Sequence, residues 1–349
     1  CHLAMDTQKM ETSCRPIVAI ILNWNGESLL REFLPQVVAT TDPAITRLVV
    51  ADNGSDDGSL RYLRDNWEGK VDILSFSENL GFAGGYNRAI VECGQHPYAV
   101  LLNSDLATDA GWDHALLEYM ESHPDTGACQ PKILSYRNPE VFEYAGACGG
   151  YVDRDCYPYC RGRIFGVCEA DKGQYDTPAE VFWASGAALM VRRKLYMALG
   201  GLDPQFFAHM EEIDLCWRIR LAGFSIAVVP AASVRHLGGG SLEAGNPRKV
   251  YLNFRNNLLM MHKNLPDSVR GRLLLRRRLL DALAWAKMVA GGDFKGAAAI
   301  VRAHRDFRRM RRLYASHPDE NLIGADAGSR RSILWQHFAR RRTRFSELT

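Results

Sequence analysis

The chain has 349 residues, 47% of them hydrophobic, enough to bury one large core or two modest ones in a globular, mainly soluble protein. Nine cysteines without regular spacing, and no recognisable secretory signal, argue against a disulfide framework and predict reduced thiols in a cytosolic setting. The net charge is only +3, but residues 270–349 hold 19 Lys and Arg against 7 Asp and Glu. This excess predicts that the C-terminal segment meets a polyanion or an anionic membrane surface.

The N-terminal third alternates between short apolar segments and helical patterns. Residues 1–15 lack periodicity, and we expect a disordered start or a cloning remnant there. The segment "PIVAIILNWN" is a β-branched apolar run that ends in turn-forming residues, and a helix should follow from about Ser28. Similar units occupy residues 47–59, 71–93 and 98–122. This alternation predicts an α/β domain with a mostly parallel sheet and with ligands at the carboxyl ends of its strands.

Polar loops follow these predicted strands. Asp52, Asn53 and Asp56 can hydrogen-bond a base and a ribose, whereas "NLGFAGGYN" supplies glycines where a backbone can approach a ligand closely. Its glycines do not form the G-x-G-x-x-G dinucleotide fingerprint, which argues against an NAD-dependent dehydrogenase.

Two further segments of the sequence offer metal ligands. In "LLNSD", an apolar strand delivers Asn103 and Asp105 to its tip, where hard oxygen ligands suit Mg²⁺ or Mn²⁺ bridging a diphosphate. An isolated N-x-D is also compatible with a plain turn. His236 lies between the apolar segment "FSIAVVPAASV" and "LGGGS". A lone His at a strand end often only packs, but delivery to a Gly-rich loop favours metal ligation.

Seven motifs in order resemble the family 2 glycosyltransferases, especially their rhamnosyltransferase-like bacterial members. They are "VAIILNWNG", "VVADNGSDDGS", "NLGFAGGYN", "LLNSD", "WASGAALMVRR", "GGLDPQFFAHMEEIDLCWRIRLAGF" and "VRHLGGGS". The resemblance spans about residues 16 to 262. It implies a GT-A fold, a nucleotide-sugar donor, a divalent metal and inversion at the anomeric carbon.

The resemblance assigns roles to individual residues. Asp52 and Asn53 match the loop that contacts the nucleobase and ribose. Asn103 and Asp105 stand at the D-x-D metal motif, and His236 matches the histidine that completes the metal site. Asn103 replaces the first Asp, which leaves metal dependence open and makes Asp105 the firmer ligand. The full set expected to bind the donor is Asn23, Asn25, Asp52, Asn53, Asn79, Gly81, Gly84, Asn103 and Asp105.

The stretch "MEEIDLCWR" places three carboxylates at the start of a predicted helix. Successive helical residues are about 100° apart, so Glu211, Glu212 and Asp214 cannot all face one substrate. The family pattern resembles "ED-x-D", in which the second acid is the general base, and Glu212 holds that position. Glu211 is the alternative base, and Asp214 is expected to cap or brace the helix. Acidic residues also favour a helix start through the helix dipole alone.

Residues 144–187 mix aromatic, Gly, Asp and Arg residues in a way that suits a sugar-binding wall. Trp183 and Ser185 match the acceptor-side motif of the family. Arg161 and Arg163 could reach an acceptor phosphate, although a salt-bridged surface loop explains them equally well. The nearby cysteines do not form the two short-spaced pairs of a structural zinc site. They are Cys148, Cys156, Cys160 and Cys168.

The C-terminal part begins with residues 246–266, which are typical of a helix returning to the core. Beyond it, an apolar stripe on one helix side is accompanied by arginines, as in a helix that lies in a membrane interface. A helix that packs on its own domain is the alternative. The stripe is Leu275, Leu279, Ala282, Ala286 and Val289, and the cations are Arg272, Arg276, Arg277 and Arg278. No apolar stretch reaches the roughly 20 residues that span a bilayer, and no nucleic-acid recognition motif is present.

We therefore expect a GT-A domain over residues 16–266 and a basic helical extension over residues 267–349. Residues 16–122 should bind the nucleotide and residues 123–266 the acceptor. The expected reaction moves rhamnose or another hexose from a UDP, dTDP or GDP sugar to a glycan or lipid-linked acceptor in surface polysaccharide assembly. The enzyme would be peripheral on the inner face of the cell membrane. A nucleotidyltransferase and a non-catalytic nucleotide- or glycan-binding protein are the alternatives.

Overall fold

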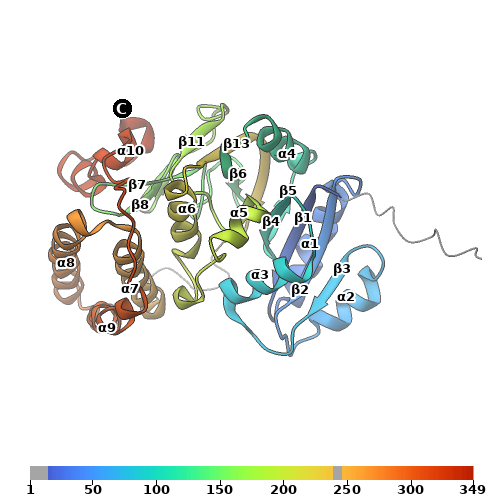
Figure 1. Cartoon of the computed structure of the whole chain (residues 1–349), viewed down its shortest axis with the longest axis horizontal. Coiled ribbons are helices and arrows are strands. Elements are labelled where there is room, and N and C mark those ends of the chain that lie inside the picture. The colour runs from blue at the N-terminus through green and yellow to red at the C-terminus, as the bar shows by residue number, and fades with distance from the viewer. Residues whose placement is uncertain (1–14, 239–245, 349) are drawn as a thin grey trace, which may run out of the picture.

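A mixed sheet forms the centre of the protein in the computed structural model, which describes residues 15–238 and 246–348 (Figure 1). From edge to edge its strands are β11 (Ala179–Val181), β13 (Ser225–His236), β6 (Thr126–Ser135), β12 (Ala188–Arg192), β4 (Tyr98–Asn103), β1 (Ile17–Asn23), β2 (Thr46–Asp52) and β3 (Asp72–Ser75), and β5 (Leu106–Thr108) pairs with β13. Residues 1–14 and the end of "LGGGS" lie outside the described residues.

The N-terminal half consists of four parallel strands and the helices that connect and cover them, as the sequence pattern predicts. Its helices are α1 (Glu27–Thr40), α2 (Ser59–Trp67), α3 (Gly81–Glu92) and α4 (Trp112–Ser122). Val18 and Ile20 of β1 belong to the same core cluster as α3, whereas Ile17 and Ala19 pack with α1 and α4. Burial on both faces explains why this strand is a continuous apolar run.

The second half makes the sheet mixed. Strand β12 is antiparallel to both β4 and β6, whereas β13 is parallel to β6. Two helices accompany these strands, α5 (Arg193–Ala198) and α6 (Glu211–Leu221). A separate antiparallel meander contains β7 (Gly150–Val152), β8 (Pro158–Cys160), β9 (Arg163–Ile164) and β10 (Val167–Cys168). The fold is nevertheless mostly parallel in the half that carries the predicted nucleotide loops.

Three long helices gather at the end of the molecule opposite β3 (Figure 1). They are α7 (Pro247–Asn264), α8 (Asp267–Ala290) and α9 (Phe294–Met310), and they are followed by α10 (Ala327–Arg330) and a π-helix at Trp335–Ala339. The prediction that residues 246–266 return to the core is confirmed, because Leu258 and Leu259 of α7 are fully buried. Within the described residues, none of the helices combines the length and the apolar character needed to cross a bilayer.

One predicted feature of α8 is wrong. Arg277, one of the four cations predicted to accompany the apolar stripe, does not reach the surface, because its side chain is only 4% exposed and its Nε lies 2.7 Å from Asp281 Oδ1. Its guanidinium carbon is 3.9 Å from the ring centroid of Tyr157, and Nη1 donates to Asn257. A buried carboxylate partner and an aromatic face make this burial tolerable for a permanently charged group. Arg277 therefore anchors α8 to the protein.

Candidate active site

Side-chain hydrogen bonds join the loops after β1 and β2 at the carboxyl edge of the sheet. Asn23 Nδ2 donates to Asp52 Oδ2 at 2.9 Å, and Ser55 Oγ donates to the same oxygen at 2.7 Å. Asn25 Nδ2 donates to Asp56 Oδ1 at 2.7 Å at the exposed loop tips. Asp52 is fully buried, so its carboxylate holds the two loops together. Its contact with a nucleobase stays a prediction.

The loop before α3 is fastened to the same edge. Asn53 Nδ2 donates to Asn79 Oδ1 at 3.0 Å and to the Gly81 carbonyl at 3.1 Å. Gly81 has φ +72°, a conformation that other residues adopt at a cost, and an added Cβ there would lie 3.8 Å from the Phe207 ring. Gly84, one turn further along α3, is partly exposed. The structure thus brings the predicted nucleotide loops together and places them beside the segment that precedes α6.

A second cluster forms where β4 and β13 end and β5 begins. His236 Nε2 lies 3.0 Å from Asp105 Oδ1 and 3.2 Å from Asn103 Nδ2, so the three predicted metal residues are in contact. The other ring nitrogen, Nδ1, lies 3.4 Å from Glu143 Oε2 and is buried without a hydrogen bond. Sequence reasoning missed Glu143, because it occupies a loop with no motif or periodicity to mark it.

The charges of this cluster stabilise one another. Burial alone would lower the pKa of His236, but Asp105 and Glu143 outweigh it and raise that pKa to about 10. Burial opposes ionisation of Asp105, but the hydrogen bond and charge of His236 hold its pKa below the usual value. The cluster is therefore an ion-paired network in the ligand-free protein.

The donor set fits a divalent metal that substrate phosphates help to bind. Carboxylate oxygen and imidazole nitrogen both suit Mn²⁺, and Mg²⁺ commonly takes only one or two carboxylates from the protein. Within the described ranges, no group of three or more His, Cys, Asp and Glu side chains has the arrangement of a complete metal site. The ring of His236 directs Nε2 toward Asp105 and Asn103, so these three side chains could meet one cation on the Nε2 side, whereas Nδ1 faces Glu143.

The start of α6 carries the candidate base. Glu211 is 5% exposed, and the Oε2 atoms of Glu211 and Glu212 are buried without a hydrogen-bond partner. Burial raises the pKa of Glu212 to about 7, and burial together with the charges of Glu212 and Asp214 raises that of Glu211 well above its usual value. Buried carboxylates with unbonded oxygens indicate a functional site rather than simple compensation of a helix dipole.

The loop between β11 and β12 lies between the candidate base and the cluster of Asp105 and His236. An added Cβ at Gly186 would lie 3.4 Å from the Cβ of Glu212, and equally close to the ring of Phe82 in α3. The next residue, Ala187, accepts a hydrogen bond from the backbone N–H of Asn103 at 2.9 Å. The tip of β4, the start of α3 and the start of α6 therefore surround one loop.

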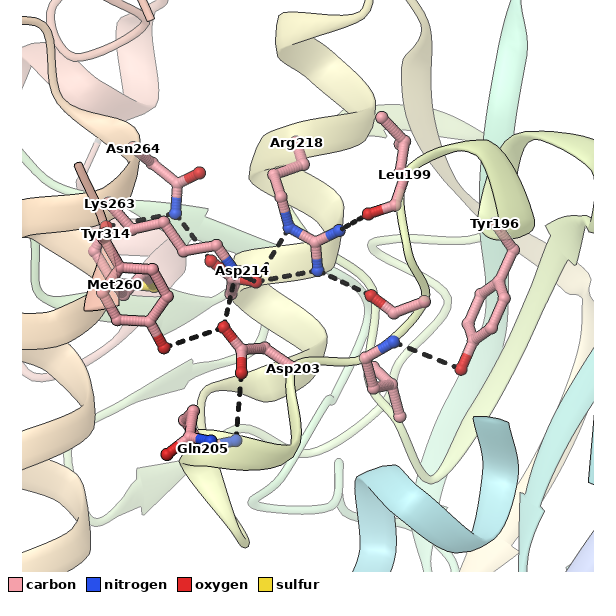
Figure 2. A network of polar contacts seen from close by, with 12 residues as sticks. Tyr196, Leu199, Asp203, Gln205, Asp214, Arg218, Met260, Lys263, Asn264 and Tyr314 are labelled. Atoms are coloured by element: carbon pink, nitrogen blue, oxygen red, sulfur yellow. Dashed lines mark hydrogen bonds and ion pairs between the residues drawn. The ribbon is translucent and has the colours of Figure 1, made fainter. Parts of the chain in front are cut away.

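Asp214 braces α6, in agreement with the predicted role, through partners on α6 and α7 (Figure 2). Its Oδ2 accepts hydrogen bonds from Arg218 Nε and Lys263 Nζ, both at 2.9 Å, and its Oδ1 accepts one from Asn264 Nδ2 at 2.8 Å. The positive partners keep the pKa of Asp214 low despite full burial. Asp214 thereby fixes α6 to α7.

The predicted acceptor residues have structural roles in this state. Trp183 is 3% exposed and donates from Nε1 to the Tyr151 carbonyl at 3.0 Å. Ser185, which is 2% exposed, donates to the Ala145 carbonyl at 3.0 Å. Arg161 donates to the Thr177 carbonyl at 3.2 Å. None of these contacts tests whether the three residues also bind an acceptor.

Arg163 is held within the small sheet. It is 8% exposed, and its Nη2 is 3.2 Å from Cys160 Sγ, while its Nε is buried without a hydrogen bond. Burial raises the pKa of the Cys160 thiol, and the charges of Glu143 and Glu212 raise it further. These contacts hold Arg163 beside Cys160, and its role in holding an acceptor stays a prediction.

A central sheet with nucleotide loops at one edge, facing buried carboxylates, defines a sugar-nucleotide transferase of the GT-A fold. Residues 18–195 match the family described as Glycosyl transferase family 2, and the chain belongs to that family. It is therefore a glycosyltransferase.

Relatives agree with this assignment. An N-acetylglucosaminyl-diphospho-decaprenol L-rhamnosyltransferase of Mycobacterium tuberculosis is 28% identical over 64% of this chain and 76% of its own length. The mannosyltransferase PcManGT of Pyrobaculum calidifontis, solved with GDP-Man and Mn²⁺, has a TM-score of 0.52 at 15% identity and aligns over 87% of this chain and 85% of its own. GalNAc-T7, solved with UDP, GalNAc and Mn²⁺, has a TM-score of 0.59 at 15% identity. The alignment covers 74% of this chain and 49% of the GalNAc-T7 chain. The two solved structures support the fold.

Proposed function

We propose that the protein is a metal-dependent, inverting glycosyltransferase that moves rhamnose or another hexose to a lipid-linked glycan acceptor in surface polysaccharide assembly. The observation that carries the proposal is Glu212, whose Oε2 is buried without a hydrogen-bond partner beside the loop that contacts the tip of β4, and whose pKa burial raises to about 7. The named acceptor of the mycobacterial relative, a diphospho-decaprenol, supports the choice of a lipid-linked substrate.

The donor would be a UDP, dTDP or GDP sugar held at the edge formed by the β1, β2 and β4 loops. Asp105 and His236 would hold Mg²⁺ or Mn²⁺, which would stabilise the negative charge that develops on the departing diphosphate. Asn103 contacts His236 and would orient its ring. Asn79, Gly81 and Gly84 would cover the nucleotide from the start of α3.

Glu212 would act as the general base. A carboxylate with a pKa near neutrality can accept the proton of an acceptor hydroxyl while still being ionised in a large fraction of molecules. Because the base lies across the loop from the donor edge, the hydroxyl would attack the face of the sugar opposite the diphosphate, and the configuration would invert. Burial and the charge of Glu212 raise the pKa of Glu211, which would disfavour two negative charges on the pair.

The alternatives explain less. A nucleotidyltransferase joins a sugar phosphate to a nucleotide and needs no base opposite the donor, so Glu212 would have no task. A non-catalytic binding protein would have no reason to keep two buried carboxyl groups with unbonded oxygens. Family membership also favours sugar transfer.

The first prediction tests the base and the metal residues in one assay. We expect Glu212→Gln to lower transfer by roughly 10²-fold or more while donor affinity stays unchanged, because Gln keeps the shape but cannot accept a proton. Asp105→Ala should abolish stimulation by Mn²⁺. The measurement is nucleoside diphosphate release from a panel of nucleotide sugars with a diphosphate-linked acceptor.

Two control variants sharpen this assay. Glu118→Gln, on the exposed side of α4, should behave like the wild type. Glu211→Gln separates the two acids, since loss of transfer there combined with normal transfer in Glu212→Gln would move the base to Glu211. Retained Mn²⁺ stimulation in Asp105→Ala would contradict the metal assignment.

We also propose that the enzyme is peripheral on the inner face of the cell membrane, where a lipid-linked acceptor would be presented. The basic C-terminal extension supports this location through its attraction to anionic lipids.

A further inference from the structure

Helix α8 has two contrasting faces. On the inner face, Arg277 and Asp281 are buried, and Asp281 Oδ2 lies 3.0 Å from His304 Nε2 of α9. On the outer face, Leu275, Leu279 and Leu283 are 60%, 62% and 68% exposed. Residues four apart form one line along a helix, so these leucines make a continuous apolar ridge. Because the inner face fixes how α8 is rotated, the ridge must face outwards.

The apolar surface continues onto the C-terminal π-helix. Trp335 and Phe338 are 58% and 61% exposed, and Lys287 Nζ of α8 lies 5.4 Å from the Phe338 ring centroid. This contact brings the π-helix alongside the last turns of α8. We call the surface formed by the ridge and these two aromatic residues the docking face. An exposed apolar surface of this kind marks an interaction site rather than a random set of surface residues.

Cations flank the ridge on both sides. The helical period puts Arg272 and Arg276 along one flank and Arg278 along the other, and Lys287, four residues beyond Leu283, ends the ridge. Arg272 and Arg276 also line a cavity of about 480 Å³ together with Arg154 and Arg330. Asp155, which pairs with Arg276 at 2.6 Å, compensates only part of this charge. The cavity is large enough, and positive enough, to admit a phosphate group beside the ridge.

We propose that the docking face seats the enzyme on an anionic lipid bilayer, with the leucine ridge in the acyl boundary and the flanking cations among the phosphates. Apolar residues flanked by Lys and Arg match the interfacial layer of a membrane. A second copy of the chain is a poorer occupant, because a symmetric contact would bring the same cations face to face. The proposal deepens the proposed function, since a lipid-linked acceptor would be presented at this surface.

The test is co-sedimentation of the full chain with phosphatidylcholine vesicles, with and without phosphatidylglycerol. We expect binding only when phosphatidylglycerol is present. The double variant Leu279→Glu/Leu283→Glu should weaken that binding by about tenfold or more, because it removes two inserting side chains and adds repulsive charge. Arg272→Gln/Lys287→Gln should weaken binding and reduce its sensitivity to salt. The matched control is Val91→Glu on α3, where the valine is 54% exposed, and it should bind like the wild type.

The outcomes are decisive. Unchanged binding by the double leucine variant, or equal wild-type binding to neutral vesicles, would overturn the proposal. So would a concentration-dependent dimer that the leucine variant dissociates, because the occupant would then be a second copy. Donor hydrolysis, measured without vesicles, should be the same in all four proteins and shows that they are folded. Vesicle binding by a protein that transfers no sugar would leave the docking face standing and reject the proposed function instead.

Discussion

At the scale of single residues, the neighbours Glu211 and Glu212 carry the chemistry of the proposed function. Both side chains point into a region where one oxygen of each has no hydrogen-bond partner. Water cannot solvate two charges there, so burial raises both pKa values and favours one shared negative charge over two. Glu212 would therefore be about half ionised near neutrality. The pKa of Asp214, two positions further on, is lowered instead, because its positive partners outweigh its burial.

This electrostatic state predicts the pH dependence of catalysis. Because the pKa of Glu212 is raised to about 7, protons bind to it as the pH falls through neutrality, and the protonated form cannot act as a base. We expect kcat/KM to fall about tenfold for each pH unit below that pKa and to level off above it. A pH profile of diphosphate release measures this directly.

Donor affinity, measured by titration over the same pH range, is the control for this profile and should stay level while kcat/KM falls. A rate that stays constant down to the usual pKa of a glutamate would contradict the assignment of Glu212.

At the scale of elements, α6 depends on α7 for its position. Asp214 receives three hydrogen bonds, and Lys263 Nζ bridges it to Asp203 Oδ2 at 2.8 Å (Figure 2). Asp203 Oδ2 also accepts a hydrogen bond from Tyr314, at 2.8 Å, in the segment after α9. The start of α6, and with it Glu212, is therefore held by residues far away in the chain.

Asp214→Asn should consequently destabilise the protein strongly. The substitution leaves Arg218 and Lys263 without part of their buried counter-charge, which typically costs about 3–5 kcal/mol. Urea unfolding at neutral pH measures the change in the free energy of unfolding. The control is Glu27→Gln, which breaks the exposed pair with Arg31 at 2.6 Å and should cost about 0.5 kcal/mol or less. A cost for Asp214→Asn no larger than that of the control would show that the network does not stabilise α6.

At the scale of the whole molecule, the C-terminal extension is part of the packing of the enzyme. Phe307, Leu322 and Ile323 belong to the core cluster that also contains Leu258 of α7. Tyr159 of the small sheet donates to the Gly328 carbonyl at 3.0 Å. The boundary at residue 266 stays a prediction, but these contacts show that residues beyond it complete the core of the preceding part.

Truncation after Pro266 should therefore do more than remove a membrane anchor. We expect the shortened chain to be poorly soluble and to lose its cooperative thermal transition, because α7 would lose the helix that covers it. Circular dichroism melting and the soluble fraction after expression measure this. The double leucine variant, which changes only exposed positions, should keep the wild-type transition. A truncated chain that melts as cooperatively as the full chain would show that the extension is an independent attachment.

The sequence by itself determined the fold of the N-terminal half, the family and the strand and helix ends at which the candidate site lies. Local periodicity sufficed for the first four strand and helix units, because a buried parallel strand must be apolar on both faces and its polar loop follows immediately. The motifs around Asp105, Glu212 and His236 lie at strand and helix ends, where a sequence pattern locates them directly. The bracing role of Asp214 could likewise be foreseen, since three acids within four helical positions cannot all face one substrate.

Only the tertiary structure decided the remaining features, because they depend on groups that meet across long stretches of chain. Glu143 joins His236 from 93 positions away, and no local pattern records that contact. In the sequence Arg277 resembles the other cations of its helix, and only the structure shows its contacts with Tyr157 and Asp281. The outward rotation of the leucine ridge follows from the same burial, since a helical pattern gives the angles between side chains but not which side meets the protein. The buried contacts of Arg277 and Asp281 determine which side of α8 faces the protein.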